Sequence, residues 1–272
     1  MLDNPRAPRV KAVAKLSTKG ARSETGLFLV EGPQAVAEAL AYRPETIVEL
    51  YATPTALERY GDIAATAVDA GVDVEFASEE VIDAMADTVT PQGFIAVVRQ
   101  FPTGLRDIFV GRDPEKNDGK PMLVAILEEV RDPGNLGTII RVADAAGADA
   151  VILTGRSVDL YNPKVVRSTT GSLFHLPIAV DAELPETLAR AREAGLRVVA
   201  ADVKGQDLPE VRAELAQPTA WLFGNEARGL DDDALAQADA AVRVPIYGDA
   251  ESMNLATAAS VCLYESAFAQ RG

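Results

Sequence analysis

The chain has 272 residues, of which 48% are hydrophobic and 25% charged, a composition typical of globular proteins and not of disordered or fibrous ones. One cysteine, Cys262, and one histidine, His175, exclude a disulfide framework and a Cys/His zinc site. The net charge of −15 argues at first against a nucleic-acid partner, because affinity for phosphates comes from Lys and Arg.

The positive charges, however, are concentrated at the N-terminus. Residues 1–22 contain one acidic side chain, Asp3, and six basic ones: Arg6, Arg9, Lys11, Lys15, Lys19 and Arg22. Such a segment is either a solvated basic terminus or an arm that contacts RNA. No apolar run reaches the roughly 18 residues that span a bilayer, and the first ten residues lack the apolar core of a signal peptide. We therefore expect a cytoplasmic protein with no membrane partner.

Apolar runs and helical stretches alternate over the first hundred residues. Strands are expected at 27–30, 46–51, 72–76 and 94–98, and helices at 33–40, 55–70 and 78–85. This alternation predicts a small α/β domain over residues 1–104. The pattern then lapses in a segment rich in Gly, Asp and Lys, which predicts a linker at residues 105–121.

The alternation resumes at Met122 and predicts a second α/β domain over residues 122–272. Strands are expected at 122–128, 150–153, 176–180, 196–201, 219–223 and 241–245, and helices at 135–146, 163–170, 184–194 and 252–268. Strands that alternate with helices predict a mostly parallel sheet covered by helices on both faces.

Polar residues gather in three segments that follow predicted strands, at residues 131–141, 224–230 and 245–255. Ligands of parallel α/β sheets bind at the carboxyl ends of the strands, so these segments are the place to expect chemistry. None of them has the Gly-x-Gly-x-x-Gly or Gly-Lys-Ser/Thr signature of nucleotide phosphate binding, which disfavours an NAD or ATP site.

Taken singly, most of these polar residues have a structural explanation. Gly224 and Gly229 are typical of a turn, and serine and asparagine are favoured helix caps, which is sufficient for any one of Asn135, Ser252 and Asn254. Arg141 differs, because a long cation in a helix of small apolar residues is best explained by an anionic partner. Within the chain, Glu226 and Asp144 are the candidates. His175 and Cys262 lie in apolar runs, and we expect them to be structural.

Taken together, the three segments resemble motifs one, two and three of the SpoU (TrmH-like) branch of the SPOUT RNA methyltransferases. Motif one has the spacing Asn-x-Gly-x-x-x-Arg, carried here by Asn135, Gly137 and Arg141. Residues 222–230 are similar to motif two and residues 244–255 to motif three. Asn225 stands where the family commonly has serine, and Met253 where it usually has leucine.

The first domain also resembles a part of this family. Residues 15–32 are similar to the substrate-binding domain, related to small ribosomal RNA-binding proteins, of the family's ribosomal-RNA enzymes and of thiostrepton-type resistance methyltransferases. Enzymes of the family that act on tRNA mostly lack this domain. The resemblance therefore favours ribosomal RNA as the substrate, with tRNA as the alternative.

The resemblance implies a parallel-sheet SPOUT domain with a deep trefoil knot, a homodimer, and no metal. It implies transfer of a methyl group from S-adenosylmethionine to a ribose 2′-hydroxyl in RNA, in particular 23S ribosomal RNA. It assigns cofactor binding to Gly224, Ile246, Leu255 and Asn254. It places at the reacting centre Asn135, Arg141, Glu226, Ser252 and Asn254. In the basic N-terminal segment we expect contacts with RNA from Arg9, Lys11, Lys15 and Arg22.

The role of Arg141 has two interpretations. The family's arginine has been assigned the role of proton acceptor, but a guanidinium keeps its proton at neutral pH. Arg141 therefore either loses its proton transiently, or stays charged, holds an RNA phosphate and stabilises the developing alkoxide. We favour the second role. Glu226 is expected to orient Arg141 or the neighbouring backbone, and Ser252 and Asn254 to position the ribose.

Two functions of other classes compete with the enzyme hypothesis. A non-catalytic RNA-binding or ribosome assembly protein could keep the same fold, although all of the motif residues are present here. A dinucleotide-dependent oxidoreductase is disfavoured by the missing phosphate-binding signature.

Overall fold

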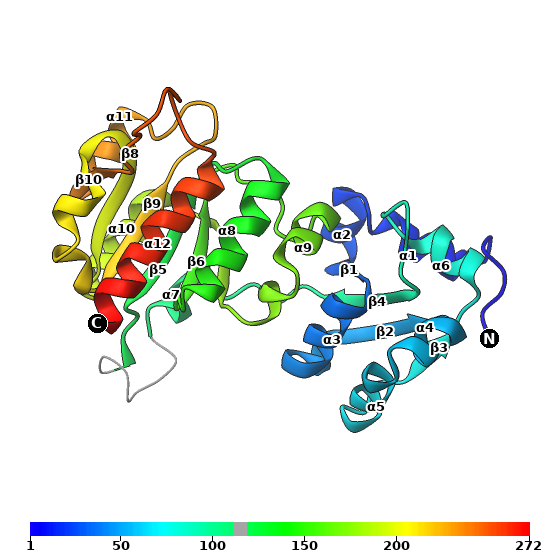
Figure 1. The fold of residues 1–272 in the computed structure, drawn as a ribbon. Helices are drawn as coiled ribbons and strands as arrows, with labels where there is room; N and C mark the ends of the chain where they lie inside the picture. The colour runs from blue at the N-terminus through cyan, green and yellow to red at the C-terminus, as the bar shows by residue number, and fades with distance from the viewer. Residues whose placement is uncertain (111–118) are drawn as a thin grey trace. The chain divides into compact units, whose positions relative to one another are not determined.

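The computed structural model describes residues 1–110 and 119–272. It divides into two compact units (Figure 1). Unit 1 consists of Met1–Phe101 and Asp159–His175, and unit 2 of Pro102–Val158 and Leu176–Gly272. Part of the predicted linker, residues 111–118, lies outside the described residues. In the part of the chain that the structure describes, no helix combines the length and the apolarity needed to cross a bilayer.

Unit 1 is a small α/β unit, as the alternation of its sequence predicts. Its strands are β1 (Leu27–Glu31), β2 (Ile47–Ala52), β3 (Val74–Phe76) and β4 (Phe94–Arg99). Its helices are α1 (Pro8–Lys15), α2 (Lys19–Thr25), α3 (Pro33–Tyr42), α4 (Pro54–Arg59), α5 (Gly61–Asp69), α6 (Glu79–Met85) and α9 (Pro163–Thr169). The sheet has the order β1-β4-β2-β3, with β4 antiparallel to both of its neighbours and β3 parallel to β2.

Short helices account for the differences from the predicted elements of unit 1. The pattern gave no helix for α1 and α2, because each is at most two turns long and mostly polar. Only Val10 and Val13 are buried in α1, and they pack with Val81 and Ile82 in the core of unit 1. The single helix expected at 55–70 is two helices, α4 and α5, separated at Tyr60.

An aromatic cluster holds the segment Asp159–His175 in unit 1. The Tyr161 ring lies 4.6 Å from the Phe28 ring, and the Phe174 ring 5.7 Å from the Phe101 ring. The Tyr161 hydroxyl also accepts a hydrogen bond from the Phe101 N–H at 2.9 Å. The sequence pattern assigned this segment to the domain at 122–272, because apolar periodicity does not say which core an apolar side chain enters.

Ion pairs add to this attachment. The Arg167 guanidinium lies 3.1 Å from the Glu31 carboxylate and 2.9 Å from that of Asp87. The His175 Nε2 lies 3.0 Å from the Glu38 carboxylate, so this histidine is structural, as expected. Helix α9 is therefore fixed on unit 1 at both of its ends.

Unit 2 contains a fully parallel six-stranded sheet. Its strands are β5 (Leu123–Glu128), β6 (Ala150–Thr154), β7 (Ile178–Ala182), β8 (Arg197–Asp207), β9 (Thr219–Phe223) and β10 (Ala240–Arg243). They have the order β10-β8-β9-β5-β6-β7. Its helices are α7 (Leu105–Ile108), α8 (Pro133–Ala145), α10 (Leu184–Glu193), α11 (Asp232–Ala236) and α12 (Leu255–Arg271).

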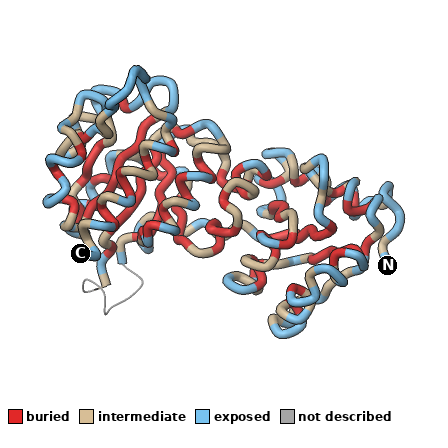
Figure 2. Tube along the Cα trace, viewed as in Figure 1, coloured by how far each residue is buried: buried red, intermediate tan, exposed pale blue. Residues whose placement is uncertain are grey.

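Helices cover both faces of this sheet, as predicted. Leu188 of α10 packs against Val124 of β5 and Leu222 of β9 in one core cluster. Trp221, the neighbour of Leu222, points to the other face, where α8 and α12 lie (Figure 1). Strands β6 and β9 are buried along their whole length, as the continuous red of the central strands shows (Figure 2). Burial on both faces explains why these strands read as unbroken apolar runs.

The single tryptophan gives a test of the core on the α12 face. Its indole N–H donates to Ser266 Oγ at 2.9 Å, and both residues are fully buried. We expect Ser266→Ala to lower the free energy of unfolding by about 1–3 kcal/mol, because a buried N–H loses its partner. The measurement is urea unfolding followed by Trp221 fluorescence.

The matched control is Ser260→Ala on the same helix. Ser260 Oγ donates to the Ala256 carbonyl of its own helix, so we expect a change within about 0.5 kcal/mol. Equal stability of the Ser266→Ala variant and the wild-type protein would contradict the described packing.

Candidate active site

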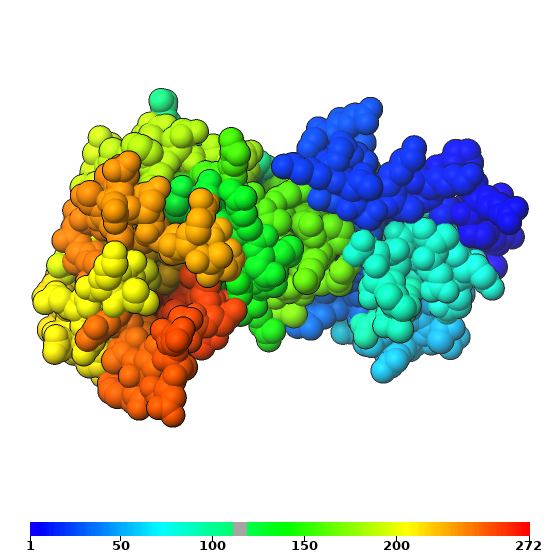
Figure 3. Space-filling model, turned by 90° about the horizontal axis from the view of Figure 1, so that it is seen from above, coloured from blue at the N-terminus to red at the C-terminus, as the bar shows by residue number. Residues whose placement is uncertain are grey.

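A cavity of about 770 Å³ opens in unit 2 at the carboxyl ends of β8, β9 and β10. Its size is within the range of about 300–1,000 Å³ that is usual for small-molecule sites. Among the residues that line it are Phe223, Asn225, Glu226, Arg228, Leu230, Ile246, Ser252, Met253 and Leu255. Figure 3 shows this end of unit 2 from above, with the yellow end of β8 and the orange segments after β9 and β10 at one surface.

The second polar segment forms a tight turn directly after β9. The backbones of Asn225 and Gly229 exchange two hydrogen bonds, of 3.1 and 2.8 Å. A Cβ on Gly224 would lie 2.4 Å from the Gly229 carbonyl carbon, so the backbone of the turn fills the space that Gly224 leaves. Gly224 itself is buried, while its neighbours Phe223 and Asn225 line the cavity. Its conformational role is therefore to close the turn.

Glu226 links this turn to the loop after β5. Its carboxylate accepts hydrogen bonds from the backbone N–H of Arg131, at 3.1 and 3.2 Å, and of Asp132, at 3.0 Å. The Asn135 amide lies 3.4 Å from the same carboxylate. Of the two roles expected for Glu226, the structure shows the one toward the neighbouring backbone.

Asn254 brings the third segment to the same place. Its amide donates to Asn135 Oδ1 at 2.9 Å, and its own Oδ1 accepts from Thr257 N–H, which caps α12. Helix α12 therefore begins at Leu255 and not at residue 252 as expected. The chain of contacts from Glu226 through Asn135 to Asn254 joins all three polar segments, which confirms that they converge.

Arg141 lies apart from these contacts. It is exposed on α8 and does not line the cavity, and the carboxylate of Glu226 contacts the loop after β5 and Asn135 instead of Arg141. Of the two carboxylates expected as its partner, Glu226 is therefore not the one within a single chain. The α8 backbone places Arg141 six residues beyond Asn135, more than one turn further along the helix.

The sequence did not indicate Glu129, which links the loop after β5 to the turn after β9. Its carboxylate lies 3.2 Å from the Arg131 guanidinium and 2.5 Å from that of Arg228, a residue that lines the cavity. Its carbonyl accepts the Asn225 side-chain N–H at 2.8 Å. Glu129 has a positive φ of 52°, a conformation rare for glutamate, so no ordinary pattern would have placed it there.

The wall of the cavity carries both signs of charge. Carboxylates come from Asp202, Asp207, Glu226 and Glu251, and cations from Lys204, Arg228 and Arg243. The hydrogen bond to Asp207 raises the pKa of Arg243. Such a wall, next to apolar side chains, suits a ligand that has an apolar ring and a zwitterionic part. Among residues 1–110 and 119–272, no cluster of His, Cys, Asp and Glu is arranged to hold a metal ion.

The four basic residues expected to bind RNA lie in unit 1 and differ in exposure. Lys11 and Lys15 are exposed on α1. Arg9 is also exposed, but its guanidinium pairs with Glu49 and Glu75. Arg22 is only 2% exposed and forms an ion pair with Asp159, so the prediction that it contacts RNA is wrong. Local charge in the sequence does not reveal a partner 137 residues away.

Comparisons with known proteins agree with this geometry. Residues 122–264 match the model of the SpoU rRNA Methylase family, and they make up just over half of the chain. The chain belongs to this family. Residues 29–103 match a second model, described as RNA 2′-O ribose methyltransferase substrate binding. Both matches confirm the resemblance seen in the motifs, and the protein is a methyltransferase of the SpoU family.

Similar proteins cover the chain from end to end. The 23S rRNA (guanosine(2553)-2′-O)-methyltransferase RlmP of Bacillus subtilis is 33% identical over 267 residues, which are 97% of each chain. The AdoMet-bound rRNA methyltransferase from Sinorhizobium meliloti is 33% identical, with a TM-score of 0.80 over 97% of this chain and 96% of that one. The SpoU methyltransferase AviRb from Streptomyces viridochromogenes, in complex with AdoMet, is 29% identical, with a TM-score of 0.80 over 97% and 99%.

The single cysteine tests the packing behind the cavity. Cys262 is fully buried in α12, and burial raises the pKa of its thiol to about 12. Because the thiolate is the reactive form, we expect the folded protein to resist a thiol reagent such as DTNB at pH 8. In urea the same sample should release one equivalent of the coloured product. Rapid labelling of the folded protein would contradict this placement of Cys262.

Proposed function

We propose that this member of the SpoU family uses S-adenosylmethionine to methylate a ribose 2′-hydroxyl in 23S ribosomal RNA. The observation that carries the proposal is the set of hydrogen bonds joining Glu226, Asn135 and Asn254 beside the cavity. The names of relatives that act on ribosomal RNA support the substrate class. The match of residues 29–103 to a substrate-binding model favours ribosomal RNA over tRNA, because tRNA enzymes of the family mostly lack that domain.

The cavity fits S-adenosylmethionine by the chemistry of its wall. The apolar side chains of Ile246 and Leu255, with Phe223 and Leu230, suit the adenine ring. The carboxylates of Glu226 and Glu251 suit the cationic groups of the cofactor, and a cation such as Arg228 suits its carboxylate. When bound, the cofactor supplies a methyl group activated by the sulfonium. Gly224 serves this site by closing the turn that presents Asn225 and Glu226 to the cavity.

The motif residues then have separate tasks. Glu226 fixes the backbone of the loop at residues 131–132, and through it the first turn of α8. Asn135 and Asn254, which hold each other in place, offer amide groups to the ribose, and Ser252 offers a hydroxyl from the cavity wall. Arg141 keeps its charge, binds an RNA phosphate and stabilises the alkoxide that develops as the 2′-hydroxyl loses its proton.

A homodimer completes the site, because Arg141 lies outside the cavity of its own chain. Arg141 and Ala145 are four residues apart on α8 and share one face of the helix. Ala145 lines a shallow groove of about 390 Å³ together with Tyr264 and Phe268 of α12, and Phe268 is 55% exposed. A second copy that covers this groove also covers the face of α8 that carries Arg141. In this arrangement Arg141 serves the partner's cavity.

Unit 1, which includes Asp159–His175, binds the RNA substrate, and unit 2 carries out the transfer. As the family resemblance implies, the C-terminal segment of the SPOUT domain threads through a loop and forms a trefoil knot. An enzyme that modifies ribosomal RNA works in the cytoplasm, where ribosomes are.

The direct test uses the purified protein, S-adenosylmethionine and 23S ribosomal RNA, with 2′-O-methyl groups mapped by primer extension. We expect one methylated ribose with the wild-type protein. Arg141→Ala should lower the turnover number by about 100- to 1,000-fold, the usual effect of removing a donor to a developing oxyanion. Arg141→Lys should recover most of the rate with an unchanged pH profile, since a charged clamp needs no deprotonation.

The outcomes separate the alternatives. If the protein binds the RNA and transfers no methyl group under any condition, it is a binding protein on the same fold. A shifted pH profile for Arg141→Lys would favour arginine as the base.

The dimer has a test of its own, in which two inactive variants are mixed. An Arg141→Ala chain keeps an intact cavity, and an Asn135→Ala chain keeps the arginine. If Arg141 acts in the partner's site, one site in each mixed dimer is intact, and statistical exchange restores about a quarter of the wild-type rate. No recovery, with subunit exchange shown by differently tagged chains, would mean that Arg141 acts within its own chain.

A further inference from the structure

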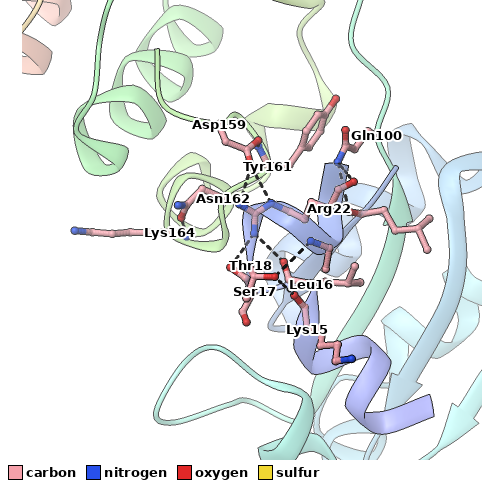
Figure 4. A network of polar contacts seen from close by, with 12 residues as sticks. Lys15, Leu16, Ser17, Thr18, Arg22, Gln100, Asp159, Tyr161, Asn162 and Lys164 are labelled. Atoms are coloured by element: carbon pink, nitrogen blue, oxygen red, sulfur yellow. Dashed lines mark hydrogen bonds and ion pairs between the residues drawn. The ribbon is translucent and has the colours of Figure 1, made fainter. Parts of the chain in front are cut away.

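Arg22 is the centre of a buried polar clamp in unit 1. Its Nε and Nη2 donate to one carboxylate oxygen of Asp159, at 2.9 and 2.6 Å. Its Nη1 donates to the carbonyls of Leu16 and Ser17, at 2.8 Å each. Figure 4 shows the guanidinium between these partners. The same group therefore holds the turn between α1 and α2 together with the residue that leads into α9.

The clamp extends to the first turn of α9. The second carboxylate oxygen of Asp159 accepts the Tyr161 N–H at 3.0 Å, and Tyr161 is buried. The side chain of Asn162 then caps the helix by accepting the Lys164 N–H at 2.9 Å. The position of Lys164 thus follows from Arg22 through a short series of hydrogen bonds.

The lysines around the clamp are exposed, whereas the clamp itself is buried and neutralised. Lys15 and Lys19 flank the turn whose carbonyls bind Arg22, and Lys11 lies one helical turn before Lys15 on the same face of α1. Lys164 is exposed between the buried Pro163 and Val165, and its side chain extends away from the clamp (Figure 4). Within the described residues, none of these four lysines forms an ion pair.

We propose that Lys11, Lys15, Lys19 and Lys164 together bind phosphates of the RNA backbone and form a lysine patch that extends on both sides of the clamp, with Lys15 on one side and Lys164 on the other (Figure 4). Arg22 and Asp159 are its positioning residues, because they fix the first turn of α9, which carries Lys164, to the turn between α1 and α2. This inference rests on the proposed function, for which it names the site that holds the RNA. Lysines act as flexible point charges, which suits contacts with backbone phosphates. Such contacts do not distinguish one base from another.

The lysine patch also explains how an acidic protein can bind RNA. A protein with a net charge of −15 repels RNA on average, so it needs a local surface from which carboxylates are kept away. Asp159 is only 18% exposed and Arg22 occupies one of its oxygens, so this carboxylate adds little negative charge to the surface. The clamp thereby brings a lysine from the second half of the chain to the basic N-terminal segment without adding a free anion.

The test measures binding of a 23S ribosomal RNA fragment as a function of salt concentration. We expect Lys164→Gln to weaken binding about threefold and to lower the slope of log K against log salt by about one, as for the loss of one phosphate contact. The matched control, Arg59→Gln, removes an exposed cation from α4 of the same unit and should leave affinity and slope unchanged. Wild-type affinity and slope for Lys164→Gln would overturn the proposal.

A double-mutant cycle tests the positioning role of the clamp. Asp159→Asn keeps an oxygen for the Tyr161 N–H but removes the charge that holds Arg22. We expect it to weaken RNA binding as much as Lys164→Gln does, and the double variant to bind no worse than either single one. Full additivity of the two effects would show that the clamp does not act through Lys164.

Two further measurements keep the test decisive. The affinity for S-adenosylmethionine, which binds in unit 2, should be unchanged in every variant, and urea unfolding followed by circular dichroism shows whether unit 1 is folded. If Asp159→Asn does not fold, Lys164→Gln and Lys15→Gln still test the patch alone. A wild-type protein that methylates ribosomal RNA, with Lys164→Gln equal to Arg59→Gln, refutes only this inference. A wild-type protein that neither binds nor methylates the RNA refutes the proposed function itself.

Discussion

One carboxylate holds the candidate active site together. Glu226 follows β9, and it accepts hydrogen bonds from the backbone of the loop that follows β5. These two strands are neighbours in the sheet, so their loops are brought within reach by strand order alone. The carboxylate then fixes the loop at the start of α8, and Asn135 on that helix holds Asn254. One acidic side chain thus ties the turn after β9 to the loop before α8, and Asn135 extends these contacts to Asn254, the cap of α12.

This arrangement explains why the site could be found from the sequence. The core strands are unbroken apolar runs, which identify a parallel sheet, and polar residues directly after such strands must meet at one edge of it. The contacts from Glu226 through Asn135 to Asn254 follow from that principle. The predicted helix starts, at residues 135 and 252, were less accurate. Asp132 and Asn254 are the caps, so α8 begins at Pro133 and α12 at Leu255.

The remaining features depend on contacts that periodicity does not encode. Arg22 is basic and near the N-terminus, so its sequence neighbours suggest a solvated residue, whereas its partner lies 137 positions away. The segment Asp159–His175 has the pattern of an ordinary helix of the second domain, yet its aromatic side chains enter the core of unit 1. Glu129 adopts a positive φ that its residue type does not predict. In each case tertiary contacts, which the local sequence does not specify, determine the conformation or the partner of the residue.

The position of Arg141 relates its role in methyl transfer to the association of two chains. The guanidinium of Arg141 is exposed on α8, outside the cavity of its own chain. Such a group suits the role of an anion clamp better than that of a base, because a base would need a buried, desolvated environment to lose its proton. If a second copy brings this arginine to the partner's cavity, the charge arrives together with the RNA phosphate that neutralises it. A lone chain would then hold the cofactor without being able to stabilise the alkoxide, so the reactive methyl group would be used only by the assembled enzyme.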